Sequence, residues 1–508
     1  MKSTLLTALA LLALSPAWAR QPNVVFILAD DLGIGDLGCY GQTKIKTPNL
    51  DRMAAEGMRF TQHYSGNAVC APSRCVLMSG MHPGHAFIRD NRGAGENAKA
   101  KAEGGRPATE GQFPITPETY TLAEAFAAQN YVTGGFGKWG LGGPESTGAP
   151  LKQGFQRWFG YNCQSVAHNF YPTYLWDNDK IIELKNSAFP SNDTFKPGED
   201  PSKPASYKRF QGTEYSADLI AEQALRFARD NKDRPFFLYW PTTVPHLALQ
   251  VPDDSLSEYQ GLWEDPPYKG GKGYLPHFAP RAAYAAMVTR MDREIGRLMK
   301  LINELGLDED TLFVFTSDNG SLNGTHAGLA GTDAAFFNSA MGLRDGKGTL
   351  YEGGIRAPGI VRWKGRIKAG VISNRVTGFE DWMPTLLELS GAKDKTPAKL
   401  DGISFAPTLL GEKQPEREFI YREFPSYGGQ QCLRMADWKL IKTGLTPGKG
   451  KAKSKFKSEP VQLYDLASDP AESQNLATKH PEIIAKMEAI MKTQHSPSAS
   501  VPMPALDR

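Results

Sequence analysis

Four short apolar segments of this chain are each followed, within a few residues, by polar residues that can take part in chemistry. They are Asn23–Ala29, Tyr131–Phe136, Phe236–Tyr239 and Thr311–Thr316. Such runs, bounded by turn residues and alternating with helical patterns, predict an α/β fold with a mostly parallel central sheet flanked by helices. Ligands of open α/β sheets bind beyond the carboxyl ends of the strands. The polar residues after the four segments are therefore expected to meet in one site.

These polar residues are of the types that bind cations and anions. In chain order they are Asp30 and Asp31, Lys138, His246, and Asp318 with Asn319. Carboxylate and amide oxygens are hard donors, which favour Ca²⁺ or Mg²⁺ over zinc. We therefore predict a divalent cation held by Asp30, Asp31, Asp318 and Asn319.

Apolar spacing predicts the main helices. The segment Arg281–Leu305 repeats apolar residues every three or four positions, which indicates a long amphipathic helix before the fourth strand. A second helix is expected over Ser216–Asp230. Thr47 followed by Pro48 is typical of a helix start, and this helix should run to Met53.

The pattern changes near Pro415, and a chain of 508 residues is long enough for a second, smaller domain. Short strands and a terminal helix are expected at Phe419–Glu423, Trp438–Lys442, Val461–Leu466 and Pro481–Met491. We predict a catalytic domain over residues 20–415 and an α+β subdomain over residues 416–508 with a short antiparallel sheet. The lysine-rich run Pro447–Lys457 reads as a solvated hairpin tip, with a role in holding a polyanionic substrate as the alternative.

Three segments rich in Gly, Pro, Lys and Asp are expected to be long surface loops and to wall a substrate cleft. They are Arg92–Thr116, Pro172–Gly212 and Pro252–Pro280.

The first 19 residues have the features of a secretory signal peptide: Lys2, an apolar run and the small-x-small sequence Ala17-Trp18-Ala19. The apolar run is shorter than the roughly 20 residues that a membrane-spanning helix needs, and no later apolar segment reaches that length. We expect an exported protein, periplasmic or extracellular, with no membrane span. The formal net charge of +3 gives no indication of nucleic-acid binding.

Five cysteines, an odd number, suggest one unpaired thiol with a function in an exported protein. Cys70 is the candidate, because Pro72 suits the first turn of a helix and Arg74 adds a cationic group nearby. The remaining cysteines, Cys39, Cys75, Cys163 and Cys432, can form up to two disulfides or remain buried and free.

The segment from Cys70 to Gly80, with its C-x-P-S-R sequence, resembles the signature of the sulfatases that use formylglycine, a family of the alkaline phosphatase superfamily. Four other segments resemble family segments in the family's order: Asn23–Gly38, Gly137–Gly142, Ser317–Gly320 and Gly346–Trp363. The resemblance covers nearly all of residues 22–410.

The resemblance implies that a formylglycine-generating enzyme oxidises Cys70 to an aldehyde. One hydroxyl of its hydrate attacks sulfur, and the second then allows sulfate to be expelled. It also implies a Ca²⁺ ion, with Mg²⁺ as the alternative, bound partly by the modified Cys70. By the same resemblance, Lys138 and Lys347 hold sulfate oxygens, Arg74 stabilises the modified Cys70, and His246 is the general acid.

One position departs from the family pattern. Relatives often have a histidine where this chain has Gly140, and that histidine is credited with helping to break down the sulfated intermediate. His168 is the first substitute that we predict and His85 the second. Their polar and aromatic neighbours equally suggest a wall that binds sugar.

The predicted activity is hydrolysis of sulfate monoesters on a sulfated carbohydrate. Export, long loops, and aromatic residues that can stack on sugars favour this substrate; the aromatic residues are Tyr161, Tyr171, Tyr174 and Trp176. One alternative is a phosphonate monoester or phosphodiester hydrolase of the same superfamily, and another is an inactive carbohydrate-binding relative. A two-zinc phosphatase is disfavoured because no histidine follows Asp318 in an Asp-x-x-x-His pattern.

Overall fold

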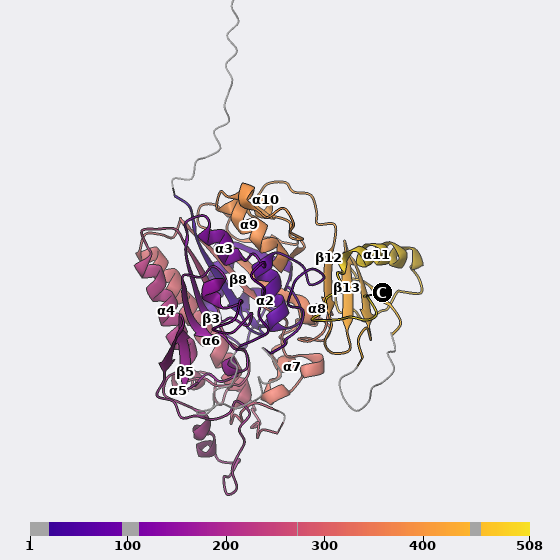
Figure 1. Cartoon of the computed structure of the whole chain (residues 1–508). Coiled ribbons are helices and arrows are strands. Elements are labelled where there is room, and N and C mark those ends of the chain that lie inside the picture. Colours follow the sequence, from indigo (N-terminus) through magenta and orange to yellow (C-terminus); the bar gives the residue numbers. More distant parts are fainter. Residues whose placement is uncertain (1–19, 94–110, 272, 448–458, 508) are drawn as a thin grey trace, which may run out of the picture.

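The computed structural model describes residues 20–93, 111–271, 273–447 and 459–507. The predicted signal peptide and most of the predicted lysine-rich hairpin tip lie outside these ranges. Figure 1 shows one large body and, at its side, a smaller sheet with the last helix.

The large body is built on an 11-stranded mixed sheet in the order β10-β2-β9-β8-β1-β7-β3-β4-β5-β6, with β11 also paired to β2. The strands are β1 (Asn23–Ala29), β2 (Met58–Tyr64), β3 (Val132–Lys138), β4 (Arg157–Tyr161), β5 (Tyr174–Asp177), β6 (Lys180–Glu183), β7 (Phe236–Pro241), β8 (Thr311–Ser317), β9 (Arg356–Arg362), β10 (Val371–Ser373) and β11 (Thr377–Gly378).

The four strands predicted from the sequence are neighbours at the centre of this sheet. β1 pairs in parallel with both β8 and β7, and β3 pairs in parallel with β7. Antiparallel pairing begins outside them, where β9 pairs with β8 and β5 pairs with β4. The mostly parallel central sheet is thus confirmed, and its carboxyl ends lie along one edge.

Helices cover both faces of the sheet. The described helices of four or more residues in the large body are α1 (Pro48–Ala55), α2 (Cys70–Ser79), α3 (Leu122–Ala127), α4 (Ser216–Asp230), α5 (Asp253–Leu256), α6 (Pro280–Glu304), α7 (Ala334–Phe337), α8 (Glu352–Ile355), α9 (Trp382–Leu389) and α10 (Ala406–Leu409). The predicted helices correspond to α1, α4 and α6, with boundaries within two residues of those expected.

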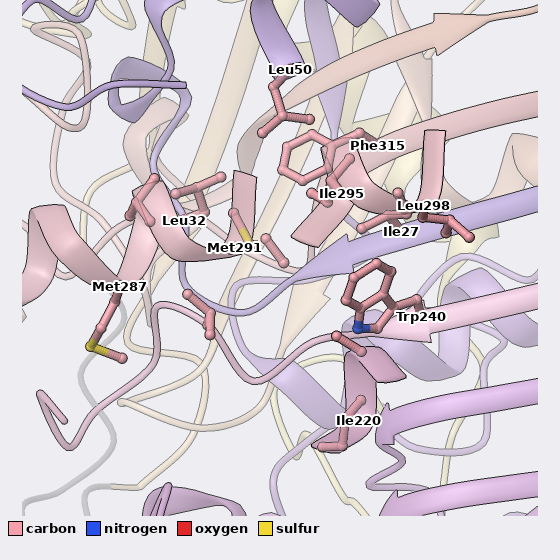
Figure 2. Packing of buried hydrophobic residues seen from close by; sticks show 14 of the residues in the cluster. Ile27, Leu32, Leu50, Ile220, Trp240, Met287, Met291, Ile295, Leu298 and Phe315 are labelled. Carbon is pink, nitrogen blue, oxygen red and sulfur yellow. The ribbon is translucent and has the colours of Figure 1, made fainter. Parts of the chain in front are cut away.

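Alternating side chains of the central strands pack on opposite faces. On one face, Ile27 and Phe315 contact the apolar stripe of α6, including Ile295, and the cluster extends to α1 and α4 (Figure 2). On the other face, Phe26 packs in a cluster with residues of α2, α3 and α9, such as Trp382. Burying both faces fixes the strand register, which in turn fixes where the strand ends lie.

The C-terminal region forms a separate antiparallel sheet in the order β12-β13-β14-β15. Its elements are β12 (Ile420–Phe424), β13 (Gln430–Met435), β14 (Trp438–Thr443), β15 (Gln462–Asp465) and α11 (Pro481–Gln494). The predicted short antiparallel sheet and terminal helix are therefore confirmed. The strand β13 was not expected.

The segment Pro172–Gly212 is not simply a loop, as the sequence suggested. It begins with the hairpin of β5 and β6, which extends the central sheet beyond β4, and ends in a 3-10 helix at Pro204–Phe210. None of its residues lines the pocket described below. The expectation that this segment walls the cleft was wrong, because its hairpin forms the edge of the central sheet.

No helix in the described ranges is both long and apolar enough to cross a membrane. All five cysteines are described, and each is a free thiol.

Candidate active site

Cys70 is the first residue of α2, where it lies against the carboxyl ends of the central strands. Its Sγ lies 3.5 Å from Oδ1 of Asp30 and 3.6 Å from Nζ of Lys347. The N–H of Ala71, unpaired within the helix, donates to Oδ1 of Asn91 at 2.9 Å. Cys70 is therefore held between a carboxylate and a lysine at the edge of the sheet.

Arg74 is one turn further along α2, so its side chain reaches the same edge. Its guanidinium binds Oδ2 of Asp318 at 2.8 Å and Oδ2 of Asp30 at 3.1 Å, and donates to the backbone oxygen of Lys138. The three side chains of this network are fully buried. Arg74 thus joins the ends of β1, β8 and β3 rather than pointing at the Cys70 sulfur.

Two lysines approach the carboxylates at the end of β1. Nζ of Lys138 lies 2.6 Å from Oδ2 of Asp30. Nζ of Lys347 lies 2.7 Å from Oδ1 and 2.8 Å from Oδ2 of Asp31. Lys347 lies in the loop before α8, and its side chain is only 12% exposed. Both cations therefore lie close to Cys70.

Asp31, Asp318 and Asn319 complete the carboxylate and amide group. Asp31 has a left-handed backbone (φ 65°), and its N–H donates to Oδ1 of Asp318 at 3.2 Å. Nδ2 of Asn319 donates to Oδ1 of Asp31 at 2.7 Å. The group consists of oxygen donors from two adjacent strands, as the sequence predicted.

The donor set fits a hard divalent cation. Oδ1 of Asn319 is buried and has no hydrogen-bond partner among the described residues, an arrangement that costs free energy unless a ligand is bound. Asp30, Asp31, Cys70 and His246 place their ligand atoms within 4.8 Å of one another. Carboxylate and amide oxygens match Ca²⁺ or Mg²⁺ better than softer metals.

Charges in this group shift its acid–base behaviour strongly. Burial opposes ionisation of Asp30, but Lys138, His246 and Arg74 hold its pKa below the usual range. Burial and the charge of Asp30 raise the pKa of Asp318 to about 6, although Arg74 binds it.

Cys70 itself is a poor nucleophile in its thiol form. Burial and the nearby Asp30 carboxylate raise the pKa of Cys70 to about 12, outweighing Lys138 and Lys347. Only the thiolate is strongly nucleophilic. From the sequence, Arg74 was expected to be the cationic group near Cys70, but its guanidinium is paired with Asp30 and Asp318.

His246 follows β7 and is buried beside Asp31, with its Nε2 3.5 Å from Oδ2 of that residue. Its Nδ1 lies 2.7 Å from the backbone oxygen of Leu247 and must carry a hydrogen, because a carbonyl can only accept. Burial and Lys347 lower the pKa of His246 well below 6.5. In the free enzyme, therefore, Nε2 is an acceptor that faces the site.

His168 packs directly on His246. Their ring centroids are 4.5 Å apart with an interplanar angle of 12°. Burial and the neighbouring His246 lower the pKa of His168. Tyr274 contacts both rings by its edge, with centroids 5.4 Å from His168 and 6.1 Å from His246.

These residues line a pocket of about 360 Å³. Asp31, Cys70 and Lys347 lie in it with His168 and His246. Tyr274 also lines the pocket and comes from Pro252–Pro280, a segment expected to wall the cleft. Other lining residues were not predicted: Gln164, His326 and Tyr427. A larger groove of about 1310 Å³ lies elsewhere and contains none of the predicted site residues; its arginines are largely paired with acidic residues.

His85 is not among the residues that line the pocket. Its Nδ1 binds the carboxylate of Asp401 at 2.9 Å, and its ring stacks on His82. The sequence prediction requires His85 in the pocket, but the structure places it outside, in a cluster with Asp401 and His82.

Gly140 has a left-handed backbone (φ 84°), and a Cβ there would lie 3.2 Å from Cγ of Gln164. Gln164 lines the pocket and donates to Oδ1 of Asn91, which in turn binds the first turn of α2. The space beside Gly140 is thus already used by a neutral amide.

The aromatic residues suggested as a sugar wall are not in the pocket. Tyr161, Tyr171 and Tyr174 are buried in the core, and Trp176 packs against it. The pocket instead receives Tyr274 and Tyr427 from loops. The sequences of these two loops have no apolar period, and their glycines indicate only that they contain turns.

Comparisons with known proteins identify the family. A family model described as Sulfatase matches residues 22–392, and one described as N-sulphoglucosamine sulphohydrolase, C-terminal, matches residues 342–496. The chain is 33% identical to arylsulfatase A of Homo sapiens, over 96% of this chain and 91% of the relative. It is 28% identical to N-acetylgalactosamine-6-O-sulfatase of Bacteroides thetaiotaomicron, over 94% of this chain and 93% of the relative.

Solved structures share the fold. The crystal structure of Ps i-CgsB matches with a TM-score of 0.70 at 24% identity, covering 93% of this chain and 92% of that chain. The PsFucS1 sulfatase from Pseudoalteromonas sp. matches with a TM-score of 0.67 at 22% identity, covering 93% and 90%. The matched family model spans most of the chain, including every strand end described above. This chain therefore belongs to the sulfatase family, has its alkaline phosphatase-like fold, and is a sulfuric ester hydrolase.

Proposed function

We propose that this enzyme hydrolyses sulfate monoesters of a sulfated carbohydrate, with a formylglycine made from Cys70 and a Ca²⁺ ion, or Mg²⁺ as the alternative. The observation that carries the proposal is the placement of Cys70 between Asp30 and Lys347, at the edge of the sheet where the carboxylates and the amide of the proposed cation site lie. Burial and Asp30 raise the pKa of the Cys70 thiol, which makes it a weak nucleophile. An oxidised Cys70 instead supplies a hydrated aldehyde with one hydroxyl for attack and another for release of sulfate.

The cation site is proposed at Asp30, Asp31, Asp318 and Asn319, with the oxygen of the modified Cys70. The cation, when bound, polarises a sulfate oxygen and favours the deprotonated form of the attacking hydroxyl. The unpartnered Oδ1 of Asn319 supports this assignment. Arg74 holds Asp30 and Asp318 at a fixed separation, so its proposed role is to keep the donors in place for the modified Cys70.

Lys138 and Lys347 are proposed to hold sulfate oxygens. Nearby carboxylates keep both lysines charged despite burial, since they raise the pKa of each amine. In a buried site such charges interact strongly with the charge that develops on sulfate as the ester bond breaks.

His246 is proposed to protonate the leaving oxygen. It is neutral in the free enzyme, so it must gain a proton at Nε2 before this step. The negative charge of a bound sulfate ester favours that protonation, because it offsets the effect of Lys347. His168 is proposed to assist breakdown of the intermediate from its stacked position.

The carbohydrate substrate is proposed from relatives and from the pocket. Relatives include the N-acetylgalactosamine-6-O-sulfatase named above, and one solved relative, at 20% identity and a TM-score of 0.68, is described in complex with D-glucosamine-2-N,6-O-disulfate. Export to the periplasm or the medium and modification by a formylglycine-generating enzyme belong to the same proposal. The end of the signal peptide at residue 19 and the domain boundary at residue 415 are also part of this proposal.

The test is sulfate release by enzyme coexpressed with the modifying enzyme. Sulfated mono- and oligosaccharides should yield inorganic sulfate, and Cys70→Ala should abolish release while leaving the thermal unfolding curve unchanged. Faster turnover of phosphodiesters or phosphonate monoesters than of every sulfate ester would favour the alternative hydrolase. Binding of sulfated sugars without any release would favour an inactive relative.

A further inference from the structure

The pocket is completed by the hairpin between β12 and β13, which belongs to the C-terminal sheet. This hairpin places Tyr427 in the lining of the pocket. Tyr427 is 59% exposed, which is unusual for an aromatic side chain next to a buried site. The residue therefore contributes little to the core, and its exposed ring surface is available to a ligand in the pocket.

The backbone of the hairpin is held in a disfavoured conformation to present this side chain. Tyr427, Gly428 and Gly429 all have left-handed φ angles, of 52°, 88° and 74°. Only glycine adopts this region without steric cost, so a tyrosine there needs support from its surroundings. The N–H of Thr446 donates to the oxygen of Gly428 at 2.9 Å, and the N–H of Leu445 donates to that of Gly429 at 3.1 Å. Backbone strain of this kind concentrates at functional sites.

The ring of Tyr427 lies beside the loop that carries Lys347. A Cβ placed on Gly348 would lie 3.6 Å from Cε2 of Tyr427 and 2.8 Å from Cε1 of His326. His326 meets Tyr427 edge to face, with centroids 5.5 Å apart at 78°. Because Gly348 directly follows Lys347, the aromatic pair is adjacent to the proposed sulfate-binding amine.

Tyr274, the other tyrosine of the pocket, has a different position. Its ring packs against His168 and His246 and is half-buried. It supports the two histidines, whereas Tyr427 keeps most of its surface free.

We propose that Tyr427, with His326 behind it, binds the face of the sugar ring whose sulfate is held at Lys347, so that the C-terminal sheet helps to determine substrate specificity. This inference rests on the proposed sulfatase activity and adds the residue that recognises the sugar. An aromatic face suits the apolar C–H face of a pyranose, which is buried without loss of hydrogen bonds. Tyr427 thus recognises the sugar ring of the substrate and not its sulfate group.

The experiment compares Tyr427→Ala and Tyr427→Phe with the unchanged enzyme. The substrates are N-acetylgalactosamine 6-sulfate and glucosamine 6-sulfate, and inorganic sulfate serves as a competitive inhibitor of 4-nitrophenyl sulfate hydrolysis. Tyr427→Ala should lower kcat/KM on whichever sugar is turned over by about tenfold, mostly through KM. Tyr427→Phe should retain most of it, and the inhibition constant of inorganic sulfate should not change. Tyr120→Ala removes another exposed tyrosine, 40% exposed and outside the pocket lining, and serves as the matched control.

A binding measurement separates this inference from the proposed function. In a Cys70→Ala background, calorimetry should show weaker binding of the same two sugars when Tyr427 is also replaced by alanine. Equal affinity or equal kcat/KM for the two forms would overturn the role of Tyr427, even if sulfate is released. No turnover by the modified enzyme, with binding that still depends on Tyr427, would overturn the proposed function alone.

Discussion

At the scale of single residues, the site combines a nucleophile precursor with a histidine pair. Cys70 is the first residue of α2, and its thiol is kept protonated by burial and by Asp30. His168 stacks on His246, and both lie in the pocket with Cys70. This geometry allows the two half-reactions to be tested separately.

Replacing His168 by phenylalanine should slow breakdown of the intermediate without stopping its formation. The variant keeps an aromatic ring on His246 but removes both nitrogen atoms. We expect kcat to fall by about 10²-fold, the usual contribution of an acid–base group. Rapid-mixing kinetics with 4-nitrophenyl sulfate should still show a burst of one nitrophenol per enzyme. An unchanged kcat, or loss of the burst, would contradict this role. His168→Ala, which also removes the stacked ring, serves as a comparison for effects on His246.

At this scale, the sequence allowed site residues to be predicted where they follow strands. Asp30, Lys138 and Asp318 were found because each lies at or within two residues of the end of an apolar run, and His246, which lies further from its run, was found with the help of the family resemblance. Tyr427 and His326 were not, because they reach the pocket from turns whose position depends on tertiary packing. His85 was misplaced for the same reason, since its partner Asp401 is 316 residues away.

At the scale of elements, β13 supports the loop that carries Lys347. The side chain of Gln430, the first residue of β13, donates to the oxygen of Gly348 at 2.9 Å. Its Oε1 accepts from the N–H of Leu350 at 2.9 Å. The amide thus bridges two residues of the loop just after Lys347, so the C-terminal sheet positions a proposed sulfate ligand.

Replacing Gln430 by leucine should therefore reduce activity without contact with substrate. Loss of both hydrogen bonds frees the loop, and we expect kcat/KM to fall by about tenfold, because small displacements of positioning groups are costly. Gln430→Glu keeps the acceptor and loses the donor, and should have an intermediate effect. Gln431→Leu changes the next residue, which binds Tyr421 instead, and is the control. Equal kcat/KM for the Gln430 and Gln431 variants would show that Gln430 does not position Lys347.

A second element-scale contact predicts a pH dependence of stability. Asp36, just after β1, accepts hydrogen bonds from Gly33, Tyr284 of α6, and Ser339. Burial raises its pKa to about 6, from 3.8. The folded state therefore binds a proton more tightly than the unfolded state, so stability contributed by this group is present at low pH and is lost as pH rises from about 4 to about 6.

The free energy of unfolding should accordingly fall by up to about 3 kcal/mol over that interval through Asp36 alone. Asp36→Asn cannot titrate and should flatten this part of the curve. Urea unfolding at pH 4, 5 and 6 measures the effect, with the exposed Asp179→Asn as control. Identical slopes for Asp36→Asn and the unchanged protein would refute the assignment.

Elements with a clear apolar period were predicted well from the sequence, and the others less well. The strand β1 and helix α4 were predicted with their observed boundaries, because apolar residues mark all buried positions except Asn23 and Ser216 at their starts. In β13 the buried positions include Gln430 and Arg434, which bind partners in the large body, and Gln431, which binds Tyr421 of β12. A strand that buries polar groups has no apolar alternation, so its period could not be recognised.

At the scale of the whole molecule, buried ion pairs connect the two sheets. Glu380 is bound by Arg417 at 2.9 Å and by Arg422 at 2.8 Å, all buried. Burial alone would raise the pKa of Glu380, but Arg422 and Arg417 lower it to about 2. Glu352, at the start of α8, is likewise paired with Lys439 of β14 at 2.9 Å. Each acid lies before residue 415 and each cation after it.

A chain that ends at residue 415 should therefore not fold on its own. Truncation would remove Arg417 and Arg422 from Glu380 and Lys439 from Glu352. Removing one partner of a buried ion pair costs about 3–5 kcal/mol. We expect residues 20–415 to be insoluble or to lack a cooperative thermal transition. Circular dichroism and size-exclusion chromatography would test this, with the chain 20–508 as reference. A monomeric, cooperatively unfolding 20–415 would show that the smaller sheet is dispensable.

The proposed mechanism of sulfate release depends on the chemical form of Cys70. The most direct measurement is mass spectrometry of the peptide that contains Cys70, from enzyme whose sulfate-releasing activity has been determined on the same sample. The fraction of peptide in which the thiol is replaced by an aldehyde, lighter by the difference between H₂S and an oxygen atom, should rise in proportion to specific activity across preparations made with different amounts of the modifying enzyme. Full activity in a preparation whose Cys70 remains a thiol would contradict the account.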